Sequence, residues 1–328
     1  MISRREFLRA GAVGAASVYG LGAVVSWADE VAPVYKNRIY KSYLVATPTD
    51  ELCVSLKELG YDGIEVTKWN ISIDEAHAIR ATVEKHGLRV SSVMRGWASF
   101  NEPDKRDATL EETKKSLRVA AALGADTVLL VPCRIGGSMP QPWEFDIDFD
   151  PKTLRIKTLG DFDNAKFADY IKAHDNATES SITAVEELIP VAAYEGVRIG
   201  LENVWNNLWV TPSFYAAFVA SFNNPWVGAY FDLGNHIRYA RVEEYLKLLS
   251  TNVLKLHIKG YNVTDVQNKL GGGKGDWCEV DKASADWKLV RKMLDEVTHF
   301  NGYVAVEEGR YDLKKYSNFL DDFIGKNK

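Results

Sequence analysis

The chain has 328 residues with a formal net charge of −5, and 46% of the residues are hydrophobic and 26% charged. This composition is typical of a soluble globular protein and excludes a disordered, collagen-like or small disulfide-stabilised chain. The mild acidity, without any run rich in Lys and Arg, argues against a nucleic-acid partner, because neutralisation of phosphates dominates such binding. Three separated cysteines, Cys53, Cys133 and Cys278, indicate neither a disulfide framework nor a thiolate zinc site. A small-molecule partner is therefore favoured.

The first 28 residues have the features of an export signal. Arg4 and Arg5 precede an apolar pair, and a weakly hydrophobic stretch rich in Ala and Gly continues to Trp27. This arrangement resembles a twin-arginine signal, and small residues at 26 and 28 predict cleavage after residue 28. The alternative is an uncleaved membrane anchor, which the many Gly and Ser residues disfavour. We therefore expect a signal peptide at 1–28, a folded domain at 29–328, no stable membrane anchor, and a periplasmic or otherwise exported location.

From residue 37 onward, short β-branched runs alternate with longer amphipathic stretches, which predicts βα units and a parallel sheet. Helical periodicity predicts helices that include residues 49–59, 74–86, 110–123 and 287–297. Eight strands are expected, at residues 39–45, 63–67, 89–94, 127–131, 198–202, 227–232, 253–258 and 302–307. Eight βα repeats in a chain of this length predict a single α/β domain, a (β/α)₈ TIM barrel rather than a doubly wound sheet.

Two segments are too long for ordinary βα loops. Residues 132–164 follow the fourth strand and are rich in Pro, Gly, Asp and aromatic residues, and residues 261–283 follow the seventh strand. The glycine-rich run 271–275 lacks the Ser or Thr of a phosphate loop, so we expect a mobile lid there. Both segments leave the C-terminal ends of strands, where barrel enzymes hold their active sites. They are therefore expected to form the walls of a pocket.

Each of the last four predicted strands carries, at or near its end, a side chain that can bind a metal ion. These are Glu202, Asp232, His257 and Glu307. Because the C-terminal ends of barrel strands meet at one rim, the four side chains are expected to converge. Three carboxylates and one imidazole suit Mn²⁺, Mg²⁺ or Co²⁺, and Zn²⁺ also binds such sites. Taken singly, each residue could instead cap a helix or form a buried hydrogen bond, but the four together favour a metal site.

At these residues the chain resembles the xylose isomerase-like TIM-barrel superfamily, often called sugar phosphate isomerases/epimerases. The matching segments are residues 201–206 (LENVWN), 230–235 (YFDLGN), 256–259 (LHIK) and 302–307 (GYVAVE). The resemblance implies one divalent metal ion, with Mn²⁺ favoured, held by Glu202, Asp232, His257 and Glu307. Glu308 is a competing fourth ligand, because strand alternation supports either phase at the end of the last strand.

Two positions depart from the ketose 3-epimerases of this superfamily. Those enzymes carry a His three residues after the metal-binding Asp, where this chain has Asn235, with His236 one place later. They also carry an Arg six residues after the metal-binding His, where this chain has Val263. Both positions grip sugar hydroxyls in the epimerases. The resemblance therefore does not transfer their substrate to this chain.

The resemblance implies a sugar isomerase or epimerase in which the metal ion stabilises an enediolate formed from a keto-sugar. Glu202 and Glu307 are expected to face each other across the metal, so that one removes a proton and the other returns it. Lys259, two residues beyond His257, is expected to reach a substrate oxygen. The remaining candidates for contact with the sugar at the pocket wall are Trp97, Trp205, Asn206, Asn235 and His236.

Export favours a free or glycosidic sugar over a sugar phosphate, which cells keep in the cytoplasm. A lyase that expels the C1 substituent of a 3-keto-glycoside through the same enolate is the main alternative. A noncatalytic sugar-binding protein is disfavoured, because such proteins have two α/β lobes. The sequence leaves homo-oligomerisation open.

Overall fold

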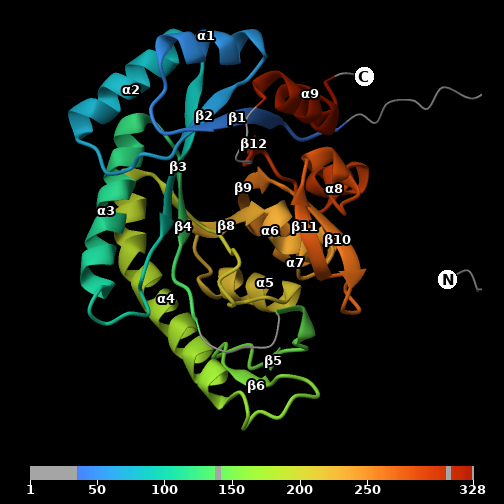
Figure 1. Cartoon of the computed structure of the whole chain (residues 1–328). Helices are drawn as coiled ribbons and strands as arrows, with labels where there is room; N and C mark the ends of the chain where they lie inside the picture. Colours follow the sequence, from blue (N-terminus) through green and yellow to red (C-terminus); the bar gives the residue numbers. More distant parts are fainter. Residues whose placement is uncertain (1–34, 137–141, 308–311, 327–328) are drawn as a thin grey trace, which may run out of the picture. The chain divides into compact units, whose positions relative to one another are not determined.

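The computed structural model describes residues 35–136, 142–307 and 312–326. Within them, eight parallel strands close into a barrel in the order β1-β12-β9-β8-β7-β4-β3-β2. The strands are β1 (Ile39–Val45), β2 (Gly63–Val66), β3 (Arg89–Trp97), β4 (Thr127–Val131), β7 (Arg198–Leu201), β8 (Val227–Asp232), β9 (Val253–Ile258) and β12 (Gly302–Val306). Figure 1 shows the helices arranged around these strands. The predicted TIM barrel is confirmed, whereas the expected signal peptide lies outside the described residues.

The barrel strands are buried on both faces, which explains their nearly continuous apolar runs. In β4 all five residues of the segment Thr-Val-Leu-Leu-Val are buried. The register between neighbouring strands matters for the site, because it fixes which side chains leave the barrel at the same level. Asp232 on β8 pairs with His257 on β9, and His257 pairs with Ala305 on β12. The ends of β8, β9 and β12 therefore lie side by side.

Helices cover the outside of the barrel, and their ends follow ordinary capping chemistry. Thr49, Ser72 and Thr211 each accept a hydrogen bond from a first-turn backbone N–H, and Gly124 ends its helix with a φ of +77°. The helices are α1 (Asp50–Glu58), α2 (Ile73–Lys85), α3 (Arg106–Leu123), α4 (Ala168–Glu195), α5 (Pro212–Ser221), α6 (Leu233–Ile237), α7 (Val242–Leu249), α8 (Trp287–Glu296) and α9 (Leu313–Ile324). None of the helices in the described ranges is long and apolar enough to cross a membrane.

The two long loops occur where the sequence predicts them, after β4 and after β9. The first contains a 3₁₀ turn, η1 (Pro142–Glu144), and the short strands β5 (Asp148–Phe149) and β6 (Ile156–Thr158) before the 28-residue helix α4. Two further 3₁₀ turns, η2 (Ser250–Asn252) and η3 (Val280–Lys282), precede β9 and α8. Together these loops add two small antiparallel sheets to the barrel.

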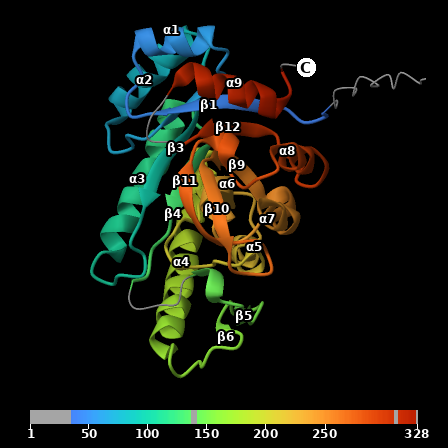
Figure 2. The same cartoon turned by 45° about the vertical axis from the view of Figure 1, so that its right-hand side comes forward.

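The loop after β9 differs from the expected mobile lid, because it forms an antiparallel hairpin of β10 (Gly260–Val266) and β11 (Gly273–Cys278). Figures 1 and 2 both show this hairpin beside α6. Two of its glycines, Gly273 and Gly275, allow the close approach of the paired strands. A Cβ added at Gly275 would lie 1.9 Å from the carbonyl oxygen of Asn262 on the partner strand. The turn is held by Asn268, whose Oδ1 accepts from the backbone N–H groups of Leu270 and Gly272.

Candidate metal centre at the barrel mouth

The structure brings together the four side chains that the sequence nominated as metal ligands. Glu202, Asp232, His257 and Glu307 each offer one ligand atom, and these atoms all lie within 4.8 Å of one another. They come from the ends of four adjacent strands, β7, β8, β9 and β12. Glu202 and Glu307 therefore occupy the two outer strands of this group. Glu308, the competing fourth ligand, lies outside the described residues.

The cluster is buried and contains polar atoms without hydrogen-bond partners. Asp232 and His257 have no exposed surface, Glu202 is 5% exposed, and the Glu307 side chain is 26% exposed. Among the described residues, Glu202 Oε1, His257 Nδ1 and Glu307 Oε2 make no hydrogen bond, although His257 Nδ1 lies 2.7 Å from Glu307 Oε2 as an ion pair. Buried polar atoms of this kind are normally satisfied. An oxygen-rich set with one imidazole nitrogen therefore fits a divalent cation.

Asp232 has two tasks at the start of α6. Its Oδ1 accepts from the backbone N–H of Asn235 at 3.0 Å, so it caps this short helix, and its Oδ2 accepts from the Asn235 side-chain amide at 3.0 Å. The helix-cap alternative is thus realised together with the position in the cluster. Lys259 Nζ lies 2.8 Å from Asp232 Oδ2 and 3.0 Å from Glu307 Oε2. Asn235 is 5% exposed and therefore orients Asp232 from below the surface.

The pKa values of the cluster reflect burial and an excess of carboxylates. Burial raises the pKa of Glu202 to about 7. Burial alone would also raise the pKa of Glu307, but the positive charges of His257 and Lys259 outweigh it and lower that pKa to about 2. Burial alone would lower the pKa of His257, yet the carboxylates of Glu65 and Glu307 raise it well above its ordinary value. Negative charge concentrated in this way attracts a cation.

Two of the predicted wall residues, Trp97 and Trp205, have surface at or near the barrel mouth. Trp97 ends β3 and is 46% exposed, with the guanidinium of Arg134 5.6 Å from its ring centre. Trp205 is partly buried, and its Nε1 donates to the Asn235 carbonyl oxygen at 3.0 Å. Trp205 thus contacts Asn235, the residue whose side chain is hydrogen-bonded to Asp232. Both indoles therefore remain candidates for contact with a sugar.

The other three wall candidates, Asn206, Asn235 and His236, are used inside the protein, which differs from the expected contact with a sugar; the Asn235 amide donates to Asp232. Asn206 is 1% exposed, donates from Nδ2 to the Cys133 carbonyl and accepts from the Leu208 N–H. His236 is fully buried, with Nδ1 2.6 Å from the Asp232 carbonyl oxygen. Its ring packs within 5.0 Å of the rings of Tyr215, Phe231 and Tyr245, in the layer between β8 and the helices α5 and α7. Asn206 thus joins the loop after β7 to the segment after β4, and His236 is part of the core.

Sequence reasoning missed a stack of aromatic and cationic side chains next to Trp205. The Arg238 guanidinium lies 4.5 Å from the Trp143 ring centre and 4.0 Å from that of Trp205. On the hairpin, Trp277 stacks on Trp205 with ring centres 4.7 Å apart and is 50% exposed. The stack joins the loop after β4, the loop after β7, the end of α6 and the hairpin. Spacing along the chain gives no signal for such a contact.

Sequence reasoning also missed Glu65 on β2, which is fully buried and bonded to His257. The sequence does contain a sign that Glu65 has a buried partner. It stands inside the apolar run Gly-Ile-Glu-Val, where an ionisable side chain is costly to bury alone.

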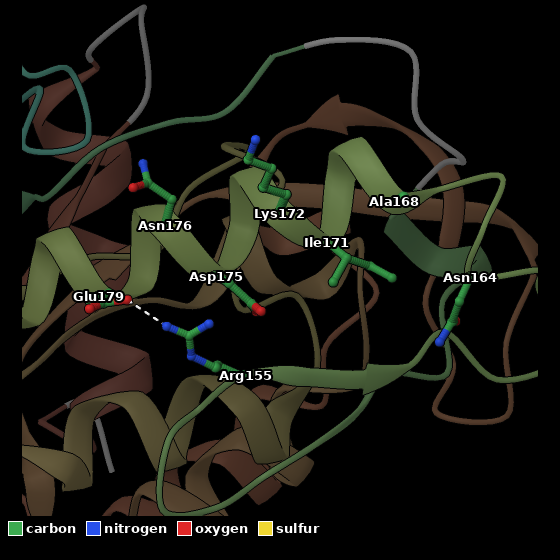
Figure 3. Close-up of a pocket in the computed structure, with 8 residues that line it drawn as sticks. All are labelled: Arg155, Asn164, Ala168, Ile171, Lys172, Asp175, Asn176 and Glu179. Carbon is green, nitrogen blue, oxygen red and sulfur yellow. Dashed lines mark hydrogen bonds and ion pairs between the residues drawn. The ribbon is translucent and has the colours of Figure 1, made fainter.

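A pocket of about 450 Å³ lies away from this centre, between α4 and residues 155–164 (Figure 3). An ion pair of 2.8 Å between Arg155 and Glu179 crosses it. None of the four clustered residues lines this pocket. Its lining consists of Arg155, Asn164, Ala168, Ile171, Lys172, Asp175, Asn176 and Glu179.

Comparison with solved structures supports the fold. A xylose isomerase-like TIM barrel protein from Mycobacterium smegmatis in complex with magnesium is 19% identical, with a TM-score of 0.58 over 84% of this chain and 87% of that one. A 3-keto-D-glucoside 4-epimerase from E. coli is 16% identical, with a TM-score of 0.57 over 88% and 99% of the two chains. A mannonate dehydratase from Streptococcus suis is 14% identical, with a TM-score of 0.62 over 88% and 95%.

No curated protein sequence matches the chain. The family model described as xylose isomerase-like TIM barrel matches residues 54–321, which include the whole cluster of Glu202, Asp232, His257 and Glu307. The chain therefore belongs to the xylose isomerase-like TIM barrel family.

Proposed function

We propose that the protein is a divalent-metal-dependent isomerase or epimerase of a free or glycosidic keto-sugar. The convergence of Glu202, Asp232, His257 and Glu307 at the ends of four adjacent barrel strands carries this proposal. Similar folds occur in a 3-keto-D-glucoside 4-epimerase and in a relative solved with magnesium, which supports both the substrate class and the cation. Mn²⁺ is the first metal to test, followed by Mg²⁺, Co²⁺ and Zn²⁺.

A divalent cation held by these four side chains would supply Lewis-acid chemistry to the carbonyl and neighbouring hydroxyl of the sugar. Glu202 and Glu307 belong to the outer strands of the group, so their carboxylates approach the space between them from two sides. One carboxylate would remove the α-proton, and the other would return a proton to the opposite face, which inverts the carbon. Return of the proton to the adjacent carbon would isomerise the sugar instead. The ammonium of Lys259, 3.0 Å from Glu307, is placed to donate to a substrate oxygen.

A lyase acting on 3-keto-glycosides is the second candidate, and Asn235 favours keeping it. This position holds a His in the ketose 3-epimerases that the chain resembles, whereas the Asn235 amide is committed to Asp232. Removal of the proton at C2 by the same carboxylates, followed by expulsion of the C1 substituent, would release the aglycone. Epimerisation and elimination therefore share their first proton transfer.

The test is to incubate Mn²⁺-loaded protein with a panel of ketoses and 3-keto-glycosides in D₂O. We expect one substrate to exchange its α-hydrogen for deuterium, measured by mass spectrometry and NMR. An aglycone released in parallel identifies the lyase, and its absence identifies the isomerase or epimerase. No exchange with any member of the panel by fully metallated protein would contradict the proposal.

The variant Glu307→Gln keeps the shape of the side chain and one oxygen ligand but removes the base. Its exchange rate should fall by about 10² to 10⁴. The matched control is Glu75→Gln, because Glu75 is an exposed surface residue paired with Lys68, and the rate should stay unchanged. Metal content must be equal in both samples. Full exchange by metallated Glu307→Gln would assign the base to another side chain.

A further inference from the structure

We propose that Glu65 is a positioning residue for the metal centre, which holds the His257 ring so that Nδ1 faces the other three ligands. This inference rests on the proposed function, because it concerns the same cluster. Glu65 lies on β2, whereas His257 lies on β9, three strands away around the closed barrel. The two residues are 192 positions apart in the chain and both are fully buried. Their contact therefore crosses the barrel interior.

The hydrogen bonds at Glu65 fix which nitrogen of His257 keeps its proton when a metal ion binds the ring. Glu65 Oε2 accepts from the hydroxyl of Tyr230 at 2.6 Å and lies 2.8 Å from His257 Nε2. Since a carboxylate oxygen accepts, Nε2 is the donor. A metal ion bound by His257 must therefore displace the proton of Nδ1, the nitrogen that faces the cluster, while Nε2 keeps its proton toward Glu65. Nδ1 lies 2.7 Å from Glu307 Oε2 and 3.7 Å from Glu202 Oε1, on the side of the cluster.

Tyr230 holds the other side of this arrangement. Its ring lies edge-on to the His257 ring, with centres 4.7 Å apart and planes at 62°. Its hydroxyl also contacts Ser92 Oγ at 3.0 Å, which limits where that hydroxyl can move. The His257 ring is thus fixed by an aromatic contact on one side and by the Glu65 carboxylate at Nε2. Few orientations remain open to the ring.

A purely structural role does not account for a carboxylate at this position. Glu65 Oε1 has no hydrogen-bond partner among the described residues, so burial of the carboxylate is only partly compensated. Replacement of buried charges by apolar residues is often neutral or stabilising in other proteins. A carboxylate bonded to the far nitrogen of a metal-binding His, however, orients the ring and strengthens it as a ligand. The position of Glu65 matches this second role.

The first test needs no variant. The protein is labelled with ¹⁵N and loaded with Zn²⁺, and the six His residues are followed in long-range ¹H–¹⁵N spectra. His257, assigned by its loss in His257→Gln, should bind the metal through Nδ1 and keep its proton on Nε2. A spectrum in which Nε2 binds the metal would overturn the proposal. A His257 signal unaffected by Zn²⁺ would overturn the metal centre itself.

The second test measures Mn²⁺ affinity by calorimetry in Glu65→Gln, which keeps the shape of the side chain and removes its charge. Kd should rise by about 10- to 100-fold. The matched control, Tyr230→Phe, removes the other donor to the same oxygen but leaves the His257 bond, so Kd should change by less than about threefold. An affinity of Glu65→Gln within twofold of the parent would overturn the proposal. Should Glu65→Gln not fold, the Zn²⁺ spectra of the parent protein decide.

Asp232→Asn separates failure of this inference from failure of the proposed function. This variant weakens a direct ligand, and its Mn²⁺ affinity should drop steeply. If Asp232→Asn binds Mn²⁺ as tightly as the parent, the metal centre is wrong. If Asp232→Asn loses Mn²⁺ while Glu65→Gln retains it, the metal centre stands and only the role of Glu65 is wrong.

Discussion

Gly234 is the position where the structure predicts the sharpest effect of adding one methyl group. A Cβ at Gly234 would lie 2.3 Å from Lys259 Cβ and 2.7 Å from the Lys259 carbonyl oxygen, whereas ordinary contact begins at 3.4 Å. The overlap of about 1 Å involves backbone atoms, so either α6 or the end of β9 must move. Gly234→Ala therefore changes the spacing between the Asp232 cap of α6 and Lys259.

Two opposing effects set the size of the change in stability. Ala is better than Gly in a helix by about 1 kcal/mol, and overpacking of this kind costs about 1–3 kcal/mol. Because the overlapped atoms include backbone, the cost exceeds the gain, and the free energy of unfolding should fall by up to about 2 kcal/mol. Mn²⁺ affinity should fall about tenfold, since a shift of α6 also moves Asp232, the residue that caps it, out of its place in the cluster.

Urea unfolding and Mn²⁺ calorimetry measure both effects without knowledge of the substrate. The matched control is Gly136→Ala, because Gly136 is exposed and nothing lies within 4 Å of its added Cβ. The reasoning is refuted if Gly234→Ala and Gly136→Ala have the same unfolding free energy and the same Mn²⁺ affinity.

Two further predictions concern His174 and Lys259. Burial lowers the pKa of His174 from 6.5 to about 3, and its Nε2 accepts from the Trp209 N–H, so the folded ring is neutral. The unfolded chain binds the extra proton as the pH falls below 6.5, so His174 should cost the protein about 2 kcal/mol of stability between pH 7 and pH 5. Urea unfolding at both pH values should show that this loss of stability disappears in His174→Gln and persists in the exposed control His77→Gln. Equal losses in the two variants would contradict this role of His174. Lys259→Met removes the ammonium that neutralises Asp232 and Glu307, so Mn²⁺ should bind about tenfold tighter or more by calorimetry, while the exposed control Lys269→Met stays unchanged. Weaker binding by Lys259→Met would show that the ammonium supports the metal site rather than competing with the cation.

The barrel and its four clustered residues could be predicted because both depend on local signals. A buried parallel strand is a short apolar run, and β4 and β9 have the predicted bounds of residues 127–131 and 253–258. A polar residue that ends such a run, such as Asp232, must lie at the rim, so convergence follows from the fold class. The positions of these four residues required no knowledge of side-chain packing.

The residues that the sequence did not reveal depend on contacts between distant segments. Nothing near Glu65 indicates His257 as its partner, because the contact arises only when the barrel closes. His236 has the composition of a site residue, but the aromatic rings of α5 and α7 enclose it. The hairpin after β9 lacks apolar alternation, and its Trp277 stacks on Trp205 from the loop after β7. Tertiary packing decided each of these cases.

The stack of Trp143, Arg238, Trp205 and Trp277 has a consequence for how the mouth of this barrel can be altered. The three indole rings come from three different loops, and the Arg238 guanidinium lies against the rings of Trp143 and Trp205. A smaller side chain at any of these four positions would therefore leave a gap beside its neighbours. A loop transplanted alone from a relative would expose the cationic face of Arg238 or the flat face of Trp205. The loops after β4, β7 and β9 are thus coupled through their side chains. Redesign of the mouth for another ligand must exchange them together.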